Sequence, residues 1–362
     1  MNKLRSVETL GSRIGMAGGV LALFAWAAVG MTTMAAATTT PVAPVVEGRW
    51  VRPAEASEER WERLPLWGHA EGLQVGLAHA GLGPRGLLRV YAPYLGNPAG
   101  RVINYIAVEP VLRGEKQRGF SELERSGLDG VAGKRFWSVA DPAEREPRSA
   151  LEPVRGEIVE IDGVECLRVW IQVEPFANGA RVYVRLVFRA DRPHEVALAA
   201  FAHEDSKPLG HCILTATMGN YARLRNLRLA ANETVSSLEL WPDHRGNGFT
   251  PHATFPLSRL KRNAEGHAVV SATPDETDPA AARYAPETRP HWRYAGRVAT
   301  QTWRCEDPDP ALQVFVNGRY VYWNSQSPIP GGVSFENFEM VSPFRQGQEF
   351  IFAVEPVVAS DE

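Results

Sequence analysis

The sequence predicts an all-β protein, built as one large antiparallel β-sandwich. Apolar and polar residues alternate with a period of two through more than ten runs. Clusters of Gly, Pro, Asn and Asp separate these runs, and helical periodicity sustained over three turns is almost absent. The 32 glycines and 27 prolines show no compositional break after residue 64. We therefore expect a single domain over residues 64–362, with about ten to eighteen strands.

The first 37 residues have the organisation of a bacterial secretory signal peptide. Lys3, Arg5 and Arg13 form a basic region, an apolar stretch follows over residues 14–31, and three alanines end at Ala37. The alternative is an uncleaved membrane anchor, which the weakly apolar Ala and Gly content disfavours. We expect cleavage near Ala37, a secreted or periplasmic product, and no membrane contact after cleavage.

Residues 38–63 begin rich in Thr, Pro and Ala and end with mixed charge, so we expect a tail or linker before the domain. The formal net charge of -3 gives no field that would favour nucleic acid as a partner. The sequence also lacks a Gly-x-Ser-x-Gly elbow, a phosphate-binding loop, a His-Glu-x-x-His motif and a dinucleotide fingerprint.

The three cysteines, Cys166, Cys212 and Cys305, are too widely spaced for a disulfide-dense scaffold or a thiolate zinc site. One bridge with one free thiol and three buried thiols are both compatible with this spacing. We expect no cofactor, and only calcium is left open. Its ligands would come from two acidic loops, through Asp275, Glu276, Asp278, Asp307 and Asp309.

Local patterns assign individual strands and turns. The run at 167–176 places four apolar residues on one face, and the run at 181–191 repeats the pattern. Asn317-Gly318 lies between two alternating runs, which predicts a hairpin with a two-residue turn.

The tripeptide Val-Glu-Pro occurs three times and includes Glu109, Glu174 and Glu355. Proline removes a backbone donor and forces the preceding residue into an extended shape, so we expect each Glu to end its strand. Glu109 differs from the other two, because a densely charged segment follows it directly. It is the first of the three to consider for catalysis.

That charged segment, residues 119–137, contains two further candidate acids or bases, Glu122 and Glu124. Their alternation would place both on one face of a strand. The alternative is a solvated hairpin with its turn at Ser126-Gly127 or over residues 128–130.

Another polar run, residues 215–229, places Tyr221, Arg223 and Arg225 on one face of a predicted strand. Two arginines two residues apart form a fork that suits the carboxylate of an acidic sugar. The alternative is a pair of structural arginines bound to neighbouring Asp or Glu. His211 precedes this run as a candidate base, and its alternative is a structural histidine.

Aromatic residues supply a candidate sugar surface, since flat rings stack on the apolar faces of sugars. Trp241 and His252 belong to a predicted loop, and six more aromatic residues follow late in the chain. These are Trp292, Tyr294, Trp303, Tyr320, Tyr322 and Trp323. The alternative is that they fill the core of the sandwich.

Four stretches, "GPRGLLRVYAPY", "INYIAVEPV", "GFSELERSGLDG" and "PIPGGVSFENFEM", together resemble a family of exported bacterial β-sandwich proteins. In general style that family is similar to the galactose-mutarotase-like and polysaccharide-lyase-like supersandwiches. The resemblance implies a style of fold and no particular activity.

We therefore expect an exported carbohydrate-active protein. A glycoside hydrolase would use two of the carboxylates Glu109, Glu122 and Glu124. A polysaccharide lyase would neutralise a uronate with Arg223 or Arg225 and take a proton with His211 or Tyr221. The alternative is a non-catalytic module that binds glycan or a cell-envelope partner. In either case the expected binding residues are Tyr221, Arg223, Arg225, Trp241, His252, Trp303 and Trp323.

Overall fold

The computed structural model describes residues 44–54, 66–78, 85–97, 101–217, 219, 221–276, 278 and 281–357. The signal peptide expected over residues 1–37 therefore lies outside the described residues. No helix within the described ranges is long and apolar enough to cross a membrane.

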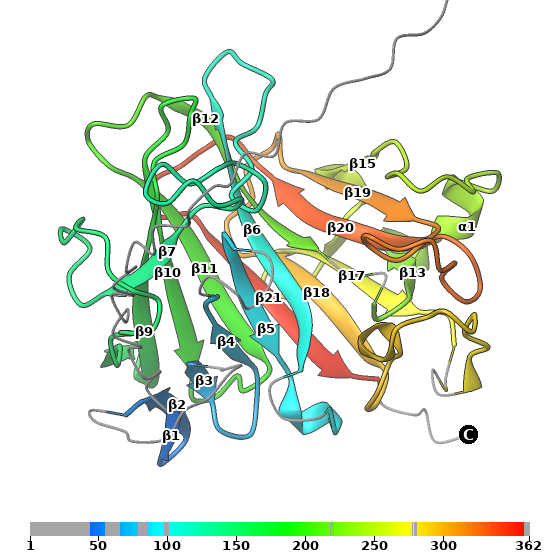
Figure 1. Ribbon diagram of the computed structural model, residues 1–362, viewed down its shortest axis with the longest axis horizontal. Coiled ribbons are helices and arrows are strands. Elements are labelled where there is room, and N and C mark those ends of the chain that lie inside the picture. The colour runs from blue at the N-terminus through cyan, green and yellow to red at the C-terminus, as the bar shows by residue number, and fades with distance from the viewer. Residues whose placement is uncertain are drawn as a thin grey trace, which may run out of the picture. The chain divides into compact units, whose positions relative to one another are not determined.

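The predicted all-β class is confirmed, because two large antiparallel sheets form a sandwich (Figure 1). The ten-stranded sheet contains, in order across the sheet, β1 (Pro44–Glu47), β2 (Trp50–Pro53), β3 (Trp67–His69), β4 (Gln74–Gly76), β5 (Leu87–Tyr91), β6 (Val102–Leu112), β12 (Leu209–Thr217), β20 (Ser334–Val341), β19 (Gln313–Arg319) and β15 (Ala253–Pro256).

The eleven-stranded sheet packs against the first. Its order is β14 (Thr234–Ser236), β13 (Leu224–Arg228), β17 (Ala268–Pro274), β18 (Ala299–Cys305), β21 (Glu349–Pro356), β11 (Glu195–Ala202), β10 (Val182–Arg189), β9 (Val164–Val173) and β7 (Phe136–Val139). Two short strands lie off this path, where β16 (Lys261–Arg262) pairs with β17 and β8 (Glu157–Ile161) pairs with β9.

Helical structure is sparse in the described residues. The one α-helix is α1 (Ser237–Leu240), and it begins with a capping box in which Ser236 and Glu239 exchange side-chain and backbone hydrogen bonds. The 3₁₀ turns are η1 (Pro93–Leu95), η2 (Ala230–Asn232), η3 (Leu257–Arg259) and η5 (Pro290–Trp292).

Within the described residues the strands run from β1 to β21, more than the ten to eighteen expected. The difference comes from strands of two to four residues, which are too short to show a period of two. Two of them, β1 and β2, fall inside residues 38–63, the range expected to be a tail or linker. They form a hairpin, and β2 pairs with β3 at the edge of the ten-stranded sheet.

The turn predicted at Asn317-Gly318 is wrong, because both residues lie inside β19. A β-bulge between them lets β19 continue alongside β20. Glycine is needed here because a Cβ atom on Gly318 would lie 2.8 Å from the carbonyl oxygen of Ser334. The chain reverses later, where the Tyr322 amide donates to the Ser327 carbonyl.

The three Val-Glu-Pro copies do not behave alike. β9 ends at Val173, just before Glu174, and β21 ends one residue after Glu355, as the prediction required to within one residue. For Glu109 the prediction is wrong, since β6 continues to Leu112. The neighbouring β5 pairs no further along β6 than Ala107, and the Pro110 carbonyl accepts from the Gly119 amide on a loop. On this side of β6 no described strand faces Pro110, so the absence of its N–H breaks no hydrogen bond between strands.

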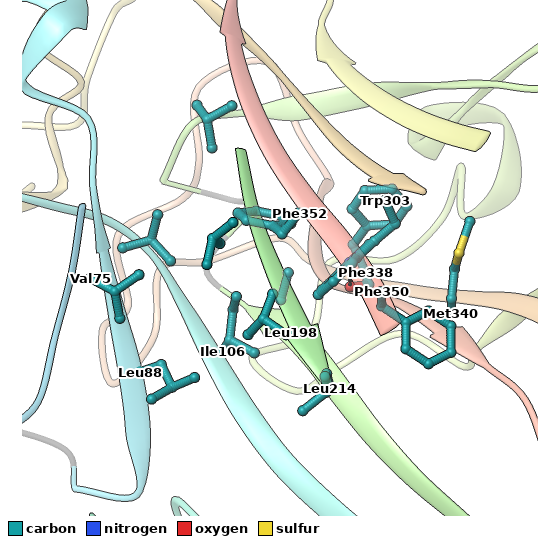
Figure 2. Packing of buried hydrophobic residues seen from close by; sticks show 14 of the residues in the cluster. Val75, Leu88, Ile106, Leu198, Leu214, Trp303, Phe338, Met340, Phe350 and Phe352 are labelled. Carbon is teal, nitrogen blue, oxygen red and sulfur yellow. Dashed lines mark hydrogen bonds between the residues drawn. The ribbon is translucent and has the colours of Figure 1, made fainter. Parts of the chain in front are cut away.

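One apolar layer fills the space between the sheets (Figure 2). Side chains of the ten-stranded sheet, such as Ile106 and Phe338, meet Trp303 and Phe352 of the eleven-stranded sheet. Trp303 is 1% exposed, and its indole N–H donates to the Phe338 carbonyl at 2.8 Å. The layer therefore joins the sheets by apolar burial and by this hydrogen bond.

We expect Trp303→Ala to lower the free energy of unfolding by about 3–5 kcal/mol, because it empties a large volume in the core. Trp323→Ala is the matched control, since this tryptophan is 36% exposed, and its cost should stay below about 1 kcal/mol. Urea unfolding of both variants measures the difference. Equal losses in the two variants would contradict the central position given to Trp303.

Candidate functional site

Three polar side chains lie on the outer face of the ten-stranded sheet, the face turned away from the shared core. They are Glu109 on β6, Thr215 on β12 and Glu339 on β20, three strands that are neighbours in the sheet. The adjoining residues Val108 and Phe338 belong to the core, and alternation turns Glu109 and Glu339 to the opposite face. We call these three residues, with Arg118 and Glu122, the sheet-face cluster.

Arg118 joins the two carboxylates of the cluster. Its Nη1 atom donates to Glu109 Oε2 at 2.6 Å and to Glu339 Oε2 at 2.9 Å, and its Nη2 donates to Glu339 Oε1 at 2.6 Å. The two Oε2 atoms share one donor nitrogen, so they lie at most about 5.5 Å apart, the sum of the first two distances. Thr215 Oγ1 also donates to Glu339.

Two carboxylates of the cluster are buried, and burial changes its acids. Glu109 is 4% and Glu339 0% exposed, whereas Arg118 and Glu122 are half-buried. The pKa of Glu109 is raised to about 8, first by burial and then by the carboxylates of Glu339 and Glu122, with Arg118 acting in the opposite direction. Burial also raises the pKa of Glu122 to about 7, and its Oε2 atom has no hydrogen-bond partner in the described structure. Perturbed acids of this kind are typical of functional sites, although buried structural networks also contain them.

The segment that carries Glu122 and Glu124 is a turn, so the prediction that both lie on one face of a strand is wrong. The Leu123 and Glu124 amides both donate to the Phe120 carbonyl. Only Glu122 belongs to the cluster. Glu124 instead contacts Lys134 Nζ at 3.1 Å and accepts from the Ala177 amide at 3.1 Å.

The hairpin alternative for residues 119–137 fits the structure better. The Ser126 amide donates to the Val131 carbonyl at 2.8 Å, and the Gly130 amide donates to the Ser126 carbonyl at 2.9 Å. Glu174 holds this hairpin, because its carboxylate accepts from the backbone amides of Gly127 and Arg135. The second Val-Glu-Pro glutamate therefore has structural partners.

The two histidines that the sequence suggested as site residues, His211 and His252, lie on or beside the same sheet. His252 approaches Asn317 Nδ2 at 3.2 Å through Nε2 and packs on Phe315. Burial lowers the pKa of His252, Glu339 raises it, and Arg118 lowers it, so His252 lies within electrostatic range of the cluster. His211, on β12, uses Nδ1 to bond the Ser342 carbonyl at 2.7 Å.

Arg223 and Arg225 are enclosed and already paired. Both are 0–1% exposed. Arg223 Nε donates to Glu276, and Arg225 Nη1 donates to Asp275 Oδ1 at 2.6 Å. Arg225 also donates to the Pro330 carbonyl. Among the described contacts none joins either arginine to His211, so the residues suggested for a lyase are not brought together around one exposed carboxylate site.

Tyr221 is buried as well. Its ring lies under the guanidinium of Arg101, 4.9 Å from the ring centroid, and beside Tyr294 at 5.9 Å between centroids. Burial raises its pKa to about 12, with Arg101 opposing that shift. The phenol therefore stays protonated at neutral pH.

A pocket of about 610 Å³ opens at one end of the sandwich, where α1 lies beside β20 and β13 (Figure 1). We call it the loop-end pocket. Its aromatic and apolar walls come from segments far apart in the sequence, and they include the predicted binding residue Trp241. The lining residues are Leu238, Trp241, Pro242, Arg245, Arg283, Tyr284, Ala285, Tyr320, Pro328, Ile329, Pro330, Gly331 and Gly332.

Internal contacts hold the aromatic walls of the pocket in place. Trp241 packs edge-on against Phe335, with 6.0 Å between ring centroids. The Tyr284 hydroxyl accepts from Arg223 and from the Tyr294 amide. The two rings are therefore presented to the pocket by a fixed framework.

The aromatic stripe predicted late in the chain is divided between core and surface. The expectation of an exposed stripe is wrong for four of its members, which are buried: Trp292, Tyr294, Trp303 and Tyr322. Tyr320 lines the pocket. Trp323 is 36% exposed and, with Phe249, encloses the guanidinium of Arg319 at 5.0 Å from each ring.

Within the described ranges no group of three His, Cys, Asp or Glu residues could hold a metal ion. The acidic loops proposed for calcium have other partners, because Asp275 and Glu276 bind arginines and Asp307 pairs with Arg345 at 2.7 Å. Asp309 accepts from the Ala311 amide. All three cysteines are free thiols.

Sequence reasoning missed Arg118 and Arg283 and did not place Glu339 in a site. The available signal for Glu339 was a charged residue between two apolar ones, Phe338 and Met340, in a strand that reads "SFENFEMV". Arg118 and Arg283 lie in irregular segments, where no periodicity indicates the direction of a side chain.

The comparisons with known proteins identify no family. No family model matches the chain, and neither a curated protein nor a solved structure matches it significantly.

The buried acids make stability depend on pH. Folded Glu109 has a pKa raised from the ordinary 4.5 to about 8, so its stabilising contribution is complete below pH 4.5 and is lost as pH rises through 8. The free energy of unfolding should fall across this window, by at most about 1.4 kcal/mol per pH unit for one group. We expect Glu109→Gln to flatten this fall in urea titrations between pH 5 and 8.

Glu144, which is partly exposed and pairs with Arg148 on the surface, supplies the control. Glu144→Gln should leave the pH dependence as it is. A Glu109→Gln variant with the full wild-type slope would show that Glu109 is ionised in the folded protein across this range.

Proposed function

We propose that the protein binds carbohydrate and that the loop-end pocket is the binding site. The observation that carries the proposal is a pocket of about 610 Å³ with Trp241, Tyr284 and Tyr320 in its walls. That volume is typical of small-molecule sites. Aromatic rings offer apolar faces on which sugar rings stack.

Two successive glycines allow one wall of the pocket to pack closely. The segment 328–332 passes along this wall with Gly331 and Gly332, both with positive φ. A Cβ atom on Gly332 would lie 3.1 Å from Leu238 Cδ2, and one on Gly331 would lie 2.9 Å from Arg225 Nη2. The Gly332 amide donates to the Ile329 carbonyl, so the wall has a fixed shape against which a ligand can pack.

Two expectations from the sequence support the proposal. A signal peptide over residues 1–37 would deliver the protein to a compartment in which polysaccharides are available. The resemblance to a family of exported bacterial β-sandwich proteins agrees with this export, and it implies a style of fold without a particular activity.

We expect Trp241→Ala to weaken oligosaccharide binding by up to about tenfold, the loss expected for one aromatic stacking contact. Isothermal titration calorimetry with xylo-, cello-, laminari- and galacturono-oligosaccharides measures the effect. Tyr320→Ala is a second variant of the same wall. Phe120→Ala is the control, since this exposed aromatic residue lies in the segment that follows β6, outside the pocket lining.

Thermal unfolding of each variant separates loss of binding from loss of folding. The proposal would be contradicted if the folded wild-type protein bound none of the oligosaccharides. It would also be contradicted by a Trp241→Ala variant with unchanged affinity together with an unchanged Tyr320→Ala variant.

Glycoside hydrolysis is the second candidate function, favoured by the spacing within the sheet-face cluster. Retaining glycosidases hold two carboxylates about 5–5.5 Å apart, and the Oε2 atoms of Glu109 and Glu339 lie at most about 5.5 Å apart. Glu109, protonated through its raised pKa, would give its proton to the glycosidic oxygen. Glu339 would attack the anomeric carbon, and water would then release the sugar. Because both carboxylates are buried, the segment that carries Arg118 must first move aside.

If the cluster is catalytic, Glu339→Gln should lower the release of reducing ends from a cleaved polysaccharide by about a thousandfold or more. Binding in the loop-end pocket should be unchanged in the same variant, because the pocket and the cluster share no residue. Glu144→Gln again serves as the surface control. Full activity in a folded Glu339→Gln variant would exclude the cluster as the site of hydrolysis.

A further inference from the structure

The described residues that line the loop-end pocket carry positive charge and include no acid. Arg245 and Arg283 are the charged residues among its lining, which includes neither Asp nor Glu. The whole chain has a formal net charge of -3, so this local excess of positive charge is a property of the pocket and does not follow from the composition.

Neither arginine is neutralised by a carboxylate of the described structure. Arg245 donates from Nη1 to the backbone carbonyls of Pro242 and His244, both at 2.9 Å, and its guanidinium lies over Tyr320 at 5.2 Å. Arg283 is exposed and has no ion pair or hydrogen bond within the described ranges. Both cations are therefore available to a ligand.

Nearby acidic residues are already committed elsewhere. Asp275 pairs with Arg225 and Glu276 pairs with Arg223. Arg225 lies directly behind the pocket wall, since a Cβ atom on Gly331 would come within 2.9 Å of its Nη2. The inner arginines thus hold Asp275 and Glu276 in ion pairs, and these two carboxylates do not neutralise the outer arginines.

We infer that the ligand of the loop-end pocket is an anionic sugar residue, whose charged group is held by Arg245 and Arg283 while its ring stacks on the aromatic wall. This inference rests on the proposed carbohydrate binding. A guanidinium presents paired N–H donors that match a carboxylate or a sulfate in a bidentate geometry. A uronate and a sulfated sugar share this chemistry, and the two are distinguished by experiment.

The first experiment compares charged and uncharged forms of the same sugars. Calorimetry of the full chain would use galacturonate oligosaccharides and their fully methyl-esterified forms, and sulfated galactan oligosaccharides and their desulfated forms. We expect at least one charged form to bind about tenfold or more tighter than its neutral partner, with a preference that shrinks at high salt. The tighter of the two charged forms identifies the anion. Equal affinities for charged and neutral forms would overturn the inference.

The second experiment assigns the anion to the two arginines. Arg283→Gln and Arg245→Gln should each weaken binding of the charged oligosaccharide by about five- to tenfold and leave the neutral form unaffected. Arg262→Gln is the matched control, because Arg262 lies on β16, is exposed and donates to the Gly266 carbonyl. If all three variants weaken binding equally, the charge preference comes from the general field and the inference fails.

The two proposals fail in different ways. If neutral oligosaccharides bind tightly and their binding depends on Trp241, the pocket is still a carbohydrate site, and only the inference of an anionic ligand is contradicted. Absence of binding to every oligosaccharide, in a protein with a cooperative unfolding transition, would remove both.

Discussion

Two broad sheets share a single apolar layer, so each strand has only its outer face and its two ends on which polar chemistry can be placed. Both sites obey this constraint. The sheet-face cluster lies on the outer face at β6, β12 and β20, and the loop-end pocket lies where α1 and the segment after β19 meet. The cluster lies wholly outside this layer, whereas the pocket shares Ile329 with it.

Burial of charge is the second constraint. Glu339 is 0% exposed and would be costly to bury alone, but it accepts hydrogen bonds from Arg118 and Thr215. Arg223 and Arg225 meet the same requirement with Glu276 and Asp275. The arginines of the pocket wall face solvent instead, so they carry no such penalty and need no internal partner.

How far the sequence predicts the fold depends on how local the information is. Alternation within one strand identifies its buried face, and the alternating residues Val182 and Val184 of β10 are in the core as expected. Prediction from local sequence fails at Asn317-Gly318. There the pairing of β19 with β20 and the nearby Ser334 carbonyl make the Asn-Gly pair a bulge and not a turn. The prediction that the strand ends at Glu109 fails because β5 does not pair with β6 beyond Ala107, so Pro110 needs no N–H on that side, and its carbonyl accepts from the Gly119 amide.

The sites are harder to predict because they depend on contacts between distant segments. Glu109 was identified from its charged neighbourhood, but its partner Glu339 is on a strand more than two hundred residues away that joins β6 only through β12. Likewise the pocket combines residues 238–245, 283–285, 320 and 328–332. No local pattern encodes which strands become neighbours, so the composition of a site follows from the order of strands in the sheet.

The segment after β6 connects the two sheets mechanically. Through Arg118 it is tied to Glu109 and Glu339 of the ten-stranded sheet, and through the amides of Gly127 and Arg135 it is tied to Glu174, which follows β9 of the other sheet. Lifting the whole segment from Arg118 to Arg135 would break contacts to both layers together. We therefore expect exposure of the cluster by this route to be a cooperative, sub-global opening event, with a frequency set by the combined strength of the two anchors.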